Sequence, residues 1–206
     1  MASAGGSENN KDLFIPVSLS NPVFDEICNK IYEEYKEACI MDINLINNPK
    51  LEEYYQLYKQ QLMKKHNVTE DKIFENYLFH GTNKDVMRII ATEGFRIEKN
   101  TTSAFGKGTY LATNPSLSFK YYLSKTKTPK PIIKGQQQKQ DIIHLFYCKL
   151  CSYNCGFVDG TSVVKQKLKK SKLVDTFVND IRNPKIFVAR ESFQAIPCYV
   201  VTFYNP

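Results

Sequence analysis

Two stretches decide the fold: Phe79-His80-Gly81-Thr82 and Gly106-Lys107-Gly108-Thr109-Tyr110-Leu111-Ala112. The first ends an apolar run, and the second is a glycine-punctuated turn that leads into aromatic and small residues. Gly81 lets the backbone approach a ligand closely, because glycine has no Cβ. Alone, Gly106–Gly108 matches neither of the glycine-rich phosphate-binding loops, so it indicates only a turn. Together the two stretches predict a cleft that handles a nucleotide.

The 206 residues carry a formal net charge of +7. A chain of this length can bury a sizeable core. The charge favours anionic partners such as nucleotides, nucleic acid or acidic protein surfaces, although a solvated lysine-rich surface explains it equally well. No apolar run reaches the roughly 18 residues that a membrane span needs, so we expect no membrane partner.

Residues 1–12 are predicted to form a disordered leader. Met1 to Ser7 are small and polar and lack the basic and apolar regions of a signal peptide. We therefore expect a cytoplasmic or nuclear location, where the six cysteines stay reduced.

Asparagine–proline pairs predict the starts of three helices, at Asn21-Pro22, Asn48-Pro49 and Asn114-Pro115. The first helix is expected to run to about Glu37. The second has an apolar stripe at helical spacing, formed by Leu51, Tyr54, Tyr55, Tyr58 and Leu62. A further helix is capped by Thr82 or Asn83, ends at Gly94, and buries Val86, Ile89 and Ile90.

Strands are predicted at Met41–Leu45, Ile73–Phe79, Thr109–Ala112, Ile142–Leu150, Ile186–Arg190 and Tyr199–Tyr204. Phe95–Lys99 is expected to be extended, and residues 100–107, 124–140 and 156–172 to be loops. The fold class is therefore α+β, with a helical N-terminal layer followed by short strands.

Several polar and aromatic side chains are placed to line the cleft. A lone histidine such as His80 is more often structural than functional, but Gly81 beside it shifts that balance. Ser118 and Tyr121 share a helix face at i and i+3. A hydroxyl and an aromatic ring on one face suit hydrogen bonding to and stacking on a planar heterocycle.

These motifs, in their order, resemble the catalytic domain of the PARP-type ADP-ribosyltransferases. The resemblance rests on Tyr77–Thr82, Phe105–Ala112, Ser116–Tyr121, Asp175–Val178, Asn183–Val188, Gln194-Ala195 and the Ile-Asn-Asn-Pro-x-Leu-x-x-Tyr-Tyr pattern ending at Tyr55, which is similar to the mono-transferase branch. It covers about residues 22–206, and residues 13–206 are accordingly predicted to form a single catalytic domain.

The resemblance implies a split, mostly antiparallel β core with N-terminal helices and a groove that binds NAD as substrate. His80 would bond a ribose hydroxyl of the adenosine half, and the Gly81 backbone and Ser118 would clamp the nicotinamide carboxamide. Tyr121 would stack on the nicotinamide ring, with Tyr110 on the other side. Thr82 and Ala112 complete the expected NAD-binding residues, and residues 100–107 correspond to the loop over the nucleotide.

A third motif residue in that family distinguishes chain builders, which carry glutamate, from single transferases. Its position is the start of the penultimate strand, eight residues before the Gln of Gln-Ala, and here it is Ile186. Isoleucine cannot polarise a ribose hydroxyl. The catalytic set His80, Tyr110 and Ile186 therefore resembles the mono-ADP-ribosyltransferases, with protein side chains, its own included, as acceptors.

Two alternatives remain open at this point. One is an inactive NAD-binding or scaffolding module, and the other is transfer to nucleic acid ends, which the charge permits but does not require. We expect a monomer.

A zinc site is the main rival interpretation for the cysteines. His144, Cys148, Cys151 and Cys155 follow an H-x3-C-x2-C-x3-C spacing, which contains four residues of the kind that bind zinc. On a strand, however, His144 and Cys148 would be roughly 13 Å apart. No metal is therefore expected. The lysine cluster between residues 165 and 172 is interpreted as a solvated loop, because no aromatic residues interleave it.

Overall fold

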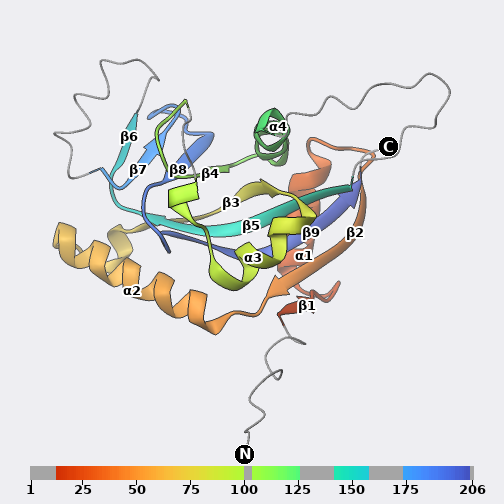
Figure 1. Cartoon of the computed structure of the whole chain (residues 1–206), viewed down its shortest axis with the longest axis horizontal. Coiled ribbons are helices and arrows are strands. Elements are labelled where there is room, and N and C mark those ends of the chain that lie inside the picture. Colours follow the sequence, from red (N-terminus) through yellow and green to blue (C-terminus); the bar gives the residue numbers. More distant parts are fainter. Residues whose placement is uncertain (1–12, 100–103, 126–141, 158–173, 205–206) are drawn as a thin grey trace, which may run out of the picture.

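The computed structural model describes residues 13–99, 104–125, 142–157 and 174–204 (Figure 1). The helices are α1 (Pro22–Tyr32), α2 (Pro49–His66), α3 (Lys84–Glu93) and α4 (Pro115–Lys125), with short 3-10 turns at Glu70–Lys72 and Ile97–Lys99. The strands are β1 (Phe14–Pro16), β2 (Cys39–Ile46), β3 (Phe74–Thr82), β4 (Thr109–Ala112), β5 (Ile142–Ser152), β6 (Cys155–Phe157), β7 (Thr176–Val178), β8 (Ile186–Ala189) and β9 (Ala195–Tyr204). The predicted leader, the tip of the 100–107 loop and nearly all of the two longer loops lie outside the described residues.

All nine strands join one sheet in the order β1-β2-β9-β5-β3-β4-β8-β7-β6. Every neighbouring pair is antiparallel except β6 and β7. β3 and β4 share one register pair, Phe79 with Ala112, whereas β3 and β5 are paired from Phe74 to Thr82. The sheet is therefore split between β3 and β4 into a larger and a smaller half, and the α+β class and split core are confirmed.

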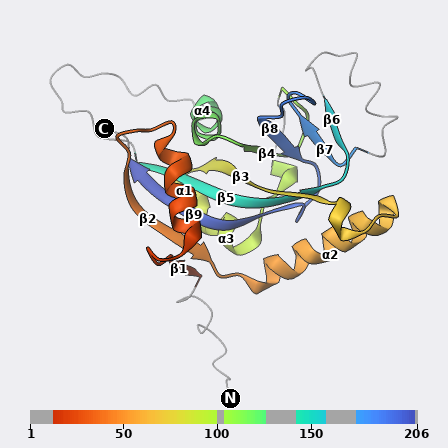
Figure 2. The same ribbon diagram turned by 180° about the vertical axis from the view of Figure 1, so that it is seen from behind.

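Helices α1 and α3 cover opposite faces of the larger half (Figures 1 and 2). Alternation along β5 explains this, since successive side chains point to opposite faces of a sheet. Phe146, Cys148 and Leu150 pack in the cluster that includes Ala91 of α3. Ile143, Leu145 and Tyr147 pack in the cluster that includes Ile27 and Ile31 of α1. β5 is thus buried on both faces and forms the centre of the core.

Asparagine side chains cap α1, α2 and α3. The caps of α1 and α2 were predicted from the sequence, and for α3 Asn83 was one of two candidates, with Thr82. Asn21 accepts a hydrogen bond from Val23 N, Asn48 from Leu51 N, and Asn83 from Val86 N. The amide of Asn48 also donates to the carbonyls of Ala91 and Thr92 at 2.9 Å. Asn48 therefore provides hydrogen-bond partners both for a backbone N–H at the start of α2 and for backbone carbonyls at the end of α3.

The end of α2 is joined to the smaller half-sheet through Asp175. Its side chain is fully buried and accepts hydrogen bonds from Lys65 Nζ at 2.6 Å and from the backbone N–H of Asn154 at 3.0 Å. His66 Nε2 lies 2.9 Å from its second oxygen. The carboxylate thus ties α2 to the turn after β5 and to the start of β7.

Several helix predictions were wrong in detail. α1 ends at Tyr32 rather than near Glu37, because the following chain forms tight turns that pack Tyr35 on Phe203. α3 buries Ala91 and packs Met87 and Ile90 against the core. Of its three predicted core residues, Val86 and Ile89 are exposed instead.

Some strand predictions also needed correction. β3 does not end before His80 but continues to Thr82, and Phe95–Lys99 contains a 3-10 turn rather than extended chain. Met41 is 56% exposed, because the β2–β9 ladder shifts register between Ile40 and Asp42; such bulges re-aim side chains. No helix among the described residues is both long enough and apolar enough to cross a membrane.

Candidate active site

The split in the sheet positions the predicted cleft. A narrow cavity of about 30 Å³ lies where β3 and β4 diverge, and it is lined by His80, Gly81, Tyr110, Leu111, Ala112, Leu117, Ser118 and Ile186. These residues come from β3, β4, α4 and β8, which are far apart in the sequence. Six of the eight predicted site residues therefore meet at one place.

His80 is fixed from the opposite side of the split. Its Nδ1 lies 2.8 Å from the carbonyl oxygen of Tyr110. Because a carbonyl only accepts hydrogen bonds, Nδ1 carries the proton in this contact. The edge of the ring also meets Phe95 at a centroid distance of 4.9 Å. In its neutral form this imidazole presents Nε2 as an acceptor.

Tyr110 holds the glycine-rich turn against the cleft. Its hydroxyl accepts from the N–H of Phe105 at 2.9 Å and donates to the carbonyl of Gly106 at 2.8 Å. Its ring packs with Phe177 and Val188. Through its own carbonyl and hydroxyl, Tyr110 links the turn before β4 to His80.

Ser118 lies on α4 and points into the sheet. Its hydroxyl is buried and donates to the carbonyl of Phe79 at 2.7 Å. This leaves the lone pairs of the hydroxyl oxygen as acceptors in the cleft. Tyr121 follows on the same helix, but its side chain lies outside the described residues.

Thr82 does not line the cavity, although it was predicted to contact NAD. It is buried at the end of β3, and its hydroxyl bonds the carbonyl of Asn83 at 3.4 Å. The strand continues through His80 and Gly81, and Thr82 is paired there with His144 on β5. It thus lies two residues further from the split than His80 does.

Ile186 begins β8, opposite Ala112 of β4. Its backbone N–H donates to the side chain of Asn179 at 2.8 Å, and its side chain packs beside Tyr110 and Val188. Among the described residues that line the cavity, none is acidic. Ile186, the residue predicted to occupy the third motif position, is thus aliphatic and lines the same cavity as His80.

A family model described as the poly(ADP-ribose) polymerase catalytic domain matches residues 23–199. The chain belongs to this family. Human protein mono-ADP-ribosyltransferase PARP14 is 27% identical over 205 residues, which cover 96% of this PARP domain and 10% of that protein. Human protein mono-ADP-ribosyltransferase PARP11 is 29% identical over 202 residues, or 92% of this chain and 59% of its own length. The mouse PARP11 is 30% identical, with 60% of its length covered.

The chain therefore spans from one tenth to about three fifths of the length of these relatives.

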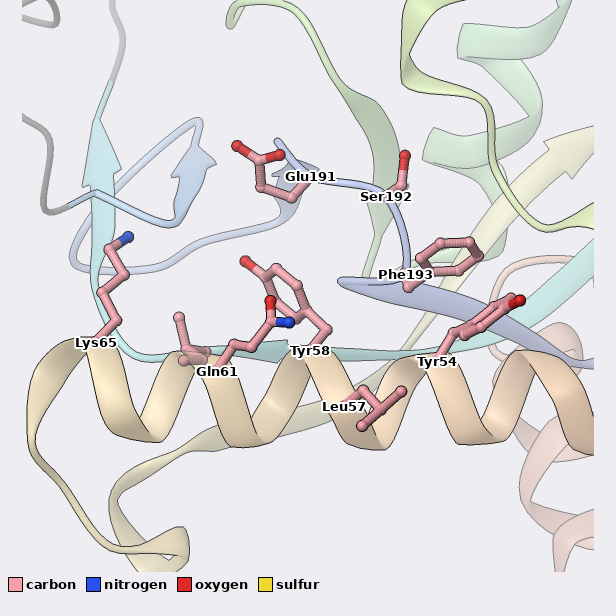
Figure 3. Close-up of a pocket in the computed structure, with 9 residues that line it drawn as sticks. Tyr54, Leu57, Tyr58, Gln61, Lys65, Glu191, Ser192 and Phe193 are labelled. Carbon is pink, nitrogen blue, oxygen red and sulfur yellow. The ribbon is translucent and has the colours of Figure 1, made fainter.

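A wider pocket lies elsewhere, away from the split in the sheet (Figure 3). It measures about 570 Å³ between α2 and the loop from β8 to β9, and it is lined by Tyr54, Leu57, Tyr58, Gln61, Leu62, Lys65, Glu191, Ser192 and Phe193. None of the predicted site residues lines it. The rings of Tyr54 and Phe193 pack there in a tilted arrangement, with their centroids 4.6 Å apart.

The proposed rival zinc ligands do not come together in this PARP domain. His144 Nδ1 contacts the hydroxyl of Thr202 at 3.2 Å. Cys148 and Cys151 are buried in different apolar clusters. In the described part of the chain, no three His, Cys, Asp or Glu side chains are grouped as metal ligands.

Sequence reasoning missed Glu34. Its carboxylate accepts from the N–H of Ser116 at 2.8 Å and from the Asn114 amide at 2.5 Å. It therefore contacts the start of the helix that carries Ser118. The two segments are about 80 residues apart, and no local pattern in the sequence indicates such a contact.

Proposed function

We propose that this chain transfers a single ADP-ribose unit from NAD to protein side chains, its own included, and releases nicotinamide. The observation that carries the proposal is the meeting of His80, Ser118 and Ile186 in one cleft at the split of the sheet. The relatives PARP14, PARP11 and PARP12 are each named as protein mono-ADP-ribosyltransferases, which supports the same activity here.

In this proposal His80 binds a ribose hydroxyl of the donor. The bond from Nδ1 to the Tyr110 carbonyl leaves Nε2 of the neutral ring as a hydrogen-bond acceptor. A ribose hydroxyl is a suitable donor for that atom. The contact with Phe95 restrains the ring further, so the histidine needs little reorganisation when the substrate arrives.

Gly81 and Ser118 hold the nicotinamide carboxamide. The Gly81 backbone offers one donor and one acceptor without a side chain in the way. The hydroxyl of Ser118 accepts from the carboxamide while it donates to Phe79. Tyr121 stacks on the nicotinamide ring. Tyr110 and Ala112, both on β4, form the opposite wall of the cleft. These contacts orient the leaving group.

The reaction breaks the bond between the ribose carbon and the nicotinamide nitrogen, which keeps the electron pair and leaves neutral. The acceptor side chain forms the new bond to that carbon and gives any proton it carries to solvent or a base. Because Ile186 cannot act as a base toward a ribose hydroxyl, the added ADP-ribose is not extended. An acidic acceptor side chain, which is already ionised at neutral pH, needs no base from the cleft.

Incubation of the chain with labelled NAD tests this proposal. We expect label on the chain or on added protein, and none with His80→Ala. Equal labelling by both would overturn it. An NAD-dependent rise in melting temperature without any transfer would instead identify an NAD-binding module. Label transferred to phosphorylated RNA but not to protein would identify the nucleic acid as acceptor.

A cytoplasmic or nuclear location belongs to the same proposal. The six cysteines are all unpaired, as is usual in a reducing compartment.

A further inference from the structure

Helix α4 begins differently from the three helices before it. In α1, α2 and α3 the asparagine ahead of the helix accepts a hydrogen bond from an N–H of its own first turn. At α4 the corresponding residue, Asn114, accepts from the Thr113 hydroxyl at 2.6 Å and donates its amide to Glu34. The residue that should cap this helix is therefore used for other contacts.

Glu34 caps α4 instead of Asn114. One of its oxygens accepts from the Ser116 N–H, which is the second residue of the helix, at 2.8 Å. Its other oxygen accepts from Asn114 at 2.5 Å. A carboxylate at this end also interacts favourably with the helix dipole. Both oxygens of one side chain thus hold the first turn of α4.

Glu34 is itself firmly placed. It lies in the turn after α1, where Tyr35 N bonds the carbonyl of Ile31 at 2.8 Å. Ile31 is fully buried, and the Tyr35 ring packs on Phe203. The start of α4 is therefore anchored by a turn that contributes no residue to the cleft.

The capped turn leads directly to the cleft. Ser118 lies two residues after Ser116, and its N–H bonds the carbonyl of Asn114. Its hydroxyl must stay within reach of the Phe79 carbonyl, which it now meets at 2.7 Å. A shift of the first turn of α4 would move Ser118 away from β3.

We propose that Glu34 is a positioning residue for nicotinamide binding, acting by capping α4 and so holding Ser118 in the cleft. This inference rests on the proposed function, because it assigns the nicotinamide carboxamide to Ser118.

The ionisation of Glu34 agrees with this role. Burial alone would raise the pKa of its carboxyl, but hydrogen bonds from Ser116 and Asn114 outweigh burial and, with the charge of Lys120, lower that pKa below 4.5. Lys120 comes from α4 and Tyr35 from the turn beside Glu34; these are the titratable neighbours whose charges act on it in the described chain. Glu34 is therefore charged at neutral pH.

The test uses Glu34→Gln in the full chain, with Glu33→Gln as the control, since Glu33 is exposed in the same turn. The first measurement is amide hydrogen exchange over residues 114–120 without any ligand. The second is the dissociation constant of nicotinamide by calorimetry. We expect faster exchange and about tenfold weaker nicotinamide binding for Glu34→Gln. Glu33→Gln should behave like the wild type, and Glu34→Asp, which keeps the charge, should lie between.

A double variant separates a positioning role from a merely structural one. In a Ser118→Ala background, adding Glu34→Gln should not weaken nicotinamide binding further, because Glu34 acts through Ser118. An equal tenfold loss in that background, or unchanged exchange at α4, would overturn the proposal. If Glu34→Gln does not fold, the comparison of Glu34→Asp with wild type decides in the same way. A wild type that neither binds nicotinamide nor transfers ADP-ribose would refute the proposed function, and the exchange measurement would still decide whether Glu34 holds α4.

Discussion

The imidazole of His80 donates a 2.8 Å hydrogen bond to the backbone carbonyl of Tyr110 across the split in the sheet. β3 and β4 share a single backbone register pair, Phe79 with Ala112. The contact from His80 thus adds a side-chain link next to that pair. The same residue joins the two half-sheets and lines the cavity between them.

His80→Ala should reduce ADP-ribose transfer by at least about 100-fold, because in the proposed function His80 orients the donor ribose. The free energy of unfolding should fall by only about 1 kcal/mol, the value of one hydrogen bond. Transfer from labelled NAD and urea denaturation measure the two effects. If the free energy of unfolding fell as severely as the transfer activity, the role of His80 would be structural.

The product should carry one ADP-ribose per modified side chain, since Ile186 provides no carboxylate to activate a further ribose. Intact-protein mass spectrometry after incubation with NAD, followed by peptide mapping, measures this. Oligomers on a single side chain would contradict the assignment of Ile186 to the third motif position.

Gly108→Ala should destabilise the fold strongly. A Cβ at this position would lie 2.2 Å from the carbonyl oxygen of Ala189, so β4 and β8 would be forced apart. We expect a loss of at least about 3 kcal/mol in the free energy of unfolding.

Gly156→Ala is the matched control for that substitution. Its Cβ would meet the methyl groups of Val174 at 2.7 and 3.0 Å, which is a contact with a side chain rather than with the backbone of a neighbouring strand. Its cost should be about 1 kcal/mol. Equal melting temperatures for the two variants would show that the β4–β8 contact tolerates the added atom.

Asp175→Asn should lower the free energy of unfolding by about 3 kcal/mol at pH 7, because Lys65 and His66 lose the buried charge between them. Asp25→Asn, at an exposed site on α1, is the control and should change little. Denaturant titration of both variants measures the difference.

The effect of Asp175 should depend on pH. Burial would raise the pKa of this carboxyl, but hydrogen bonds from Lys65, the Asn154 N–H and His66 outweigh burial and hold the pKa below 3.8. The stability it contributes is therefore present above pH 3.8 and is lost as the pH falls through the folded-state pKa. The gap between wild type and Asp175→Asn should close in strong acid. A gap that persists there would assign the effect to shape rather than charge.

The helix starts could be predicted from the sequence because their signals are local. Asn21 and Asn48 each precede a proline and cap the helix that follows, as the pattern predicts. The helix at Asn114 also starts where expected, yet its cap comes from Glu34. Pattern reasoning places an element but cannot identify partners that are distant in the chain.

The short strands could not be predicted. β1, β6 and β7 have three residues each, too few to show alternation. Phe177, for example, is part of a strand because it pairs with Gly156 on β6 and with Val188 on β8. Likewise the buried face of α3 follows from its contacts with Phe95 and β5 rather than from its own periodicity.

The site was easier to predict than its surroundings. The motif residues His80, Gly81, Tyr110, Ser118 and Ile186 line one cavity, and it was the resemblance to the PARP catalytic domain, rather than local patterns, that predicted them as one set. Thr82 does not line this cavity; it lies at the end of β3, which continues past the Phe79 end that the apolar pattern suggests.

The single register pair between β3 and β4 has a consequence for the cell. A substrate that contacts both Gly81 on β3 and Ala112 on β4 bridges the two halves where the backbone connects them least. Its binding then raises the free energy of unfolding of the domain, by an amount that grows with the substrate concentration relative to the dissociation constant. If the proposed function holds, NAD above its dissociation constant stabilises the folded domain, so a chain deprived of its substrate would unfold more readily.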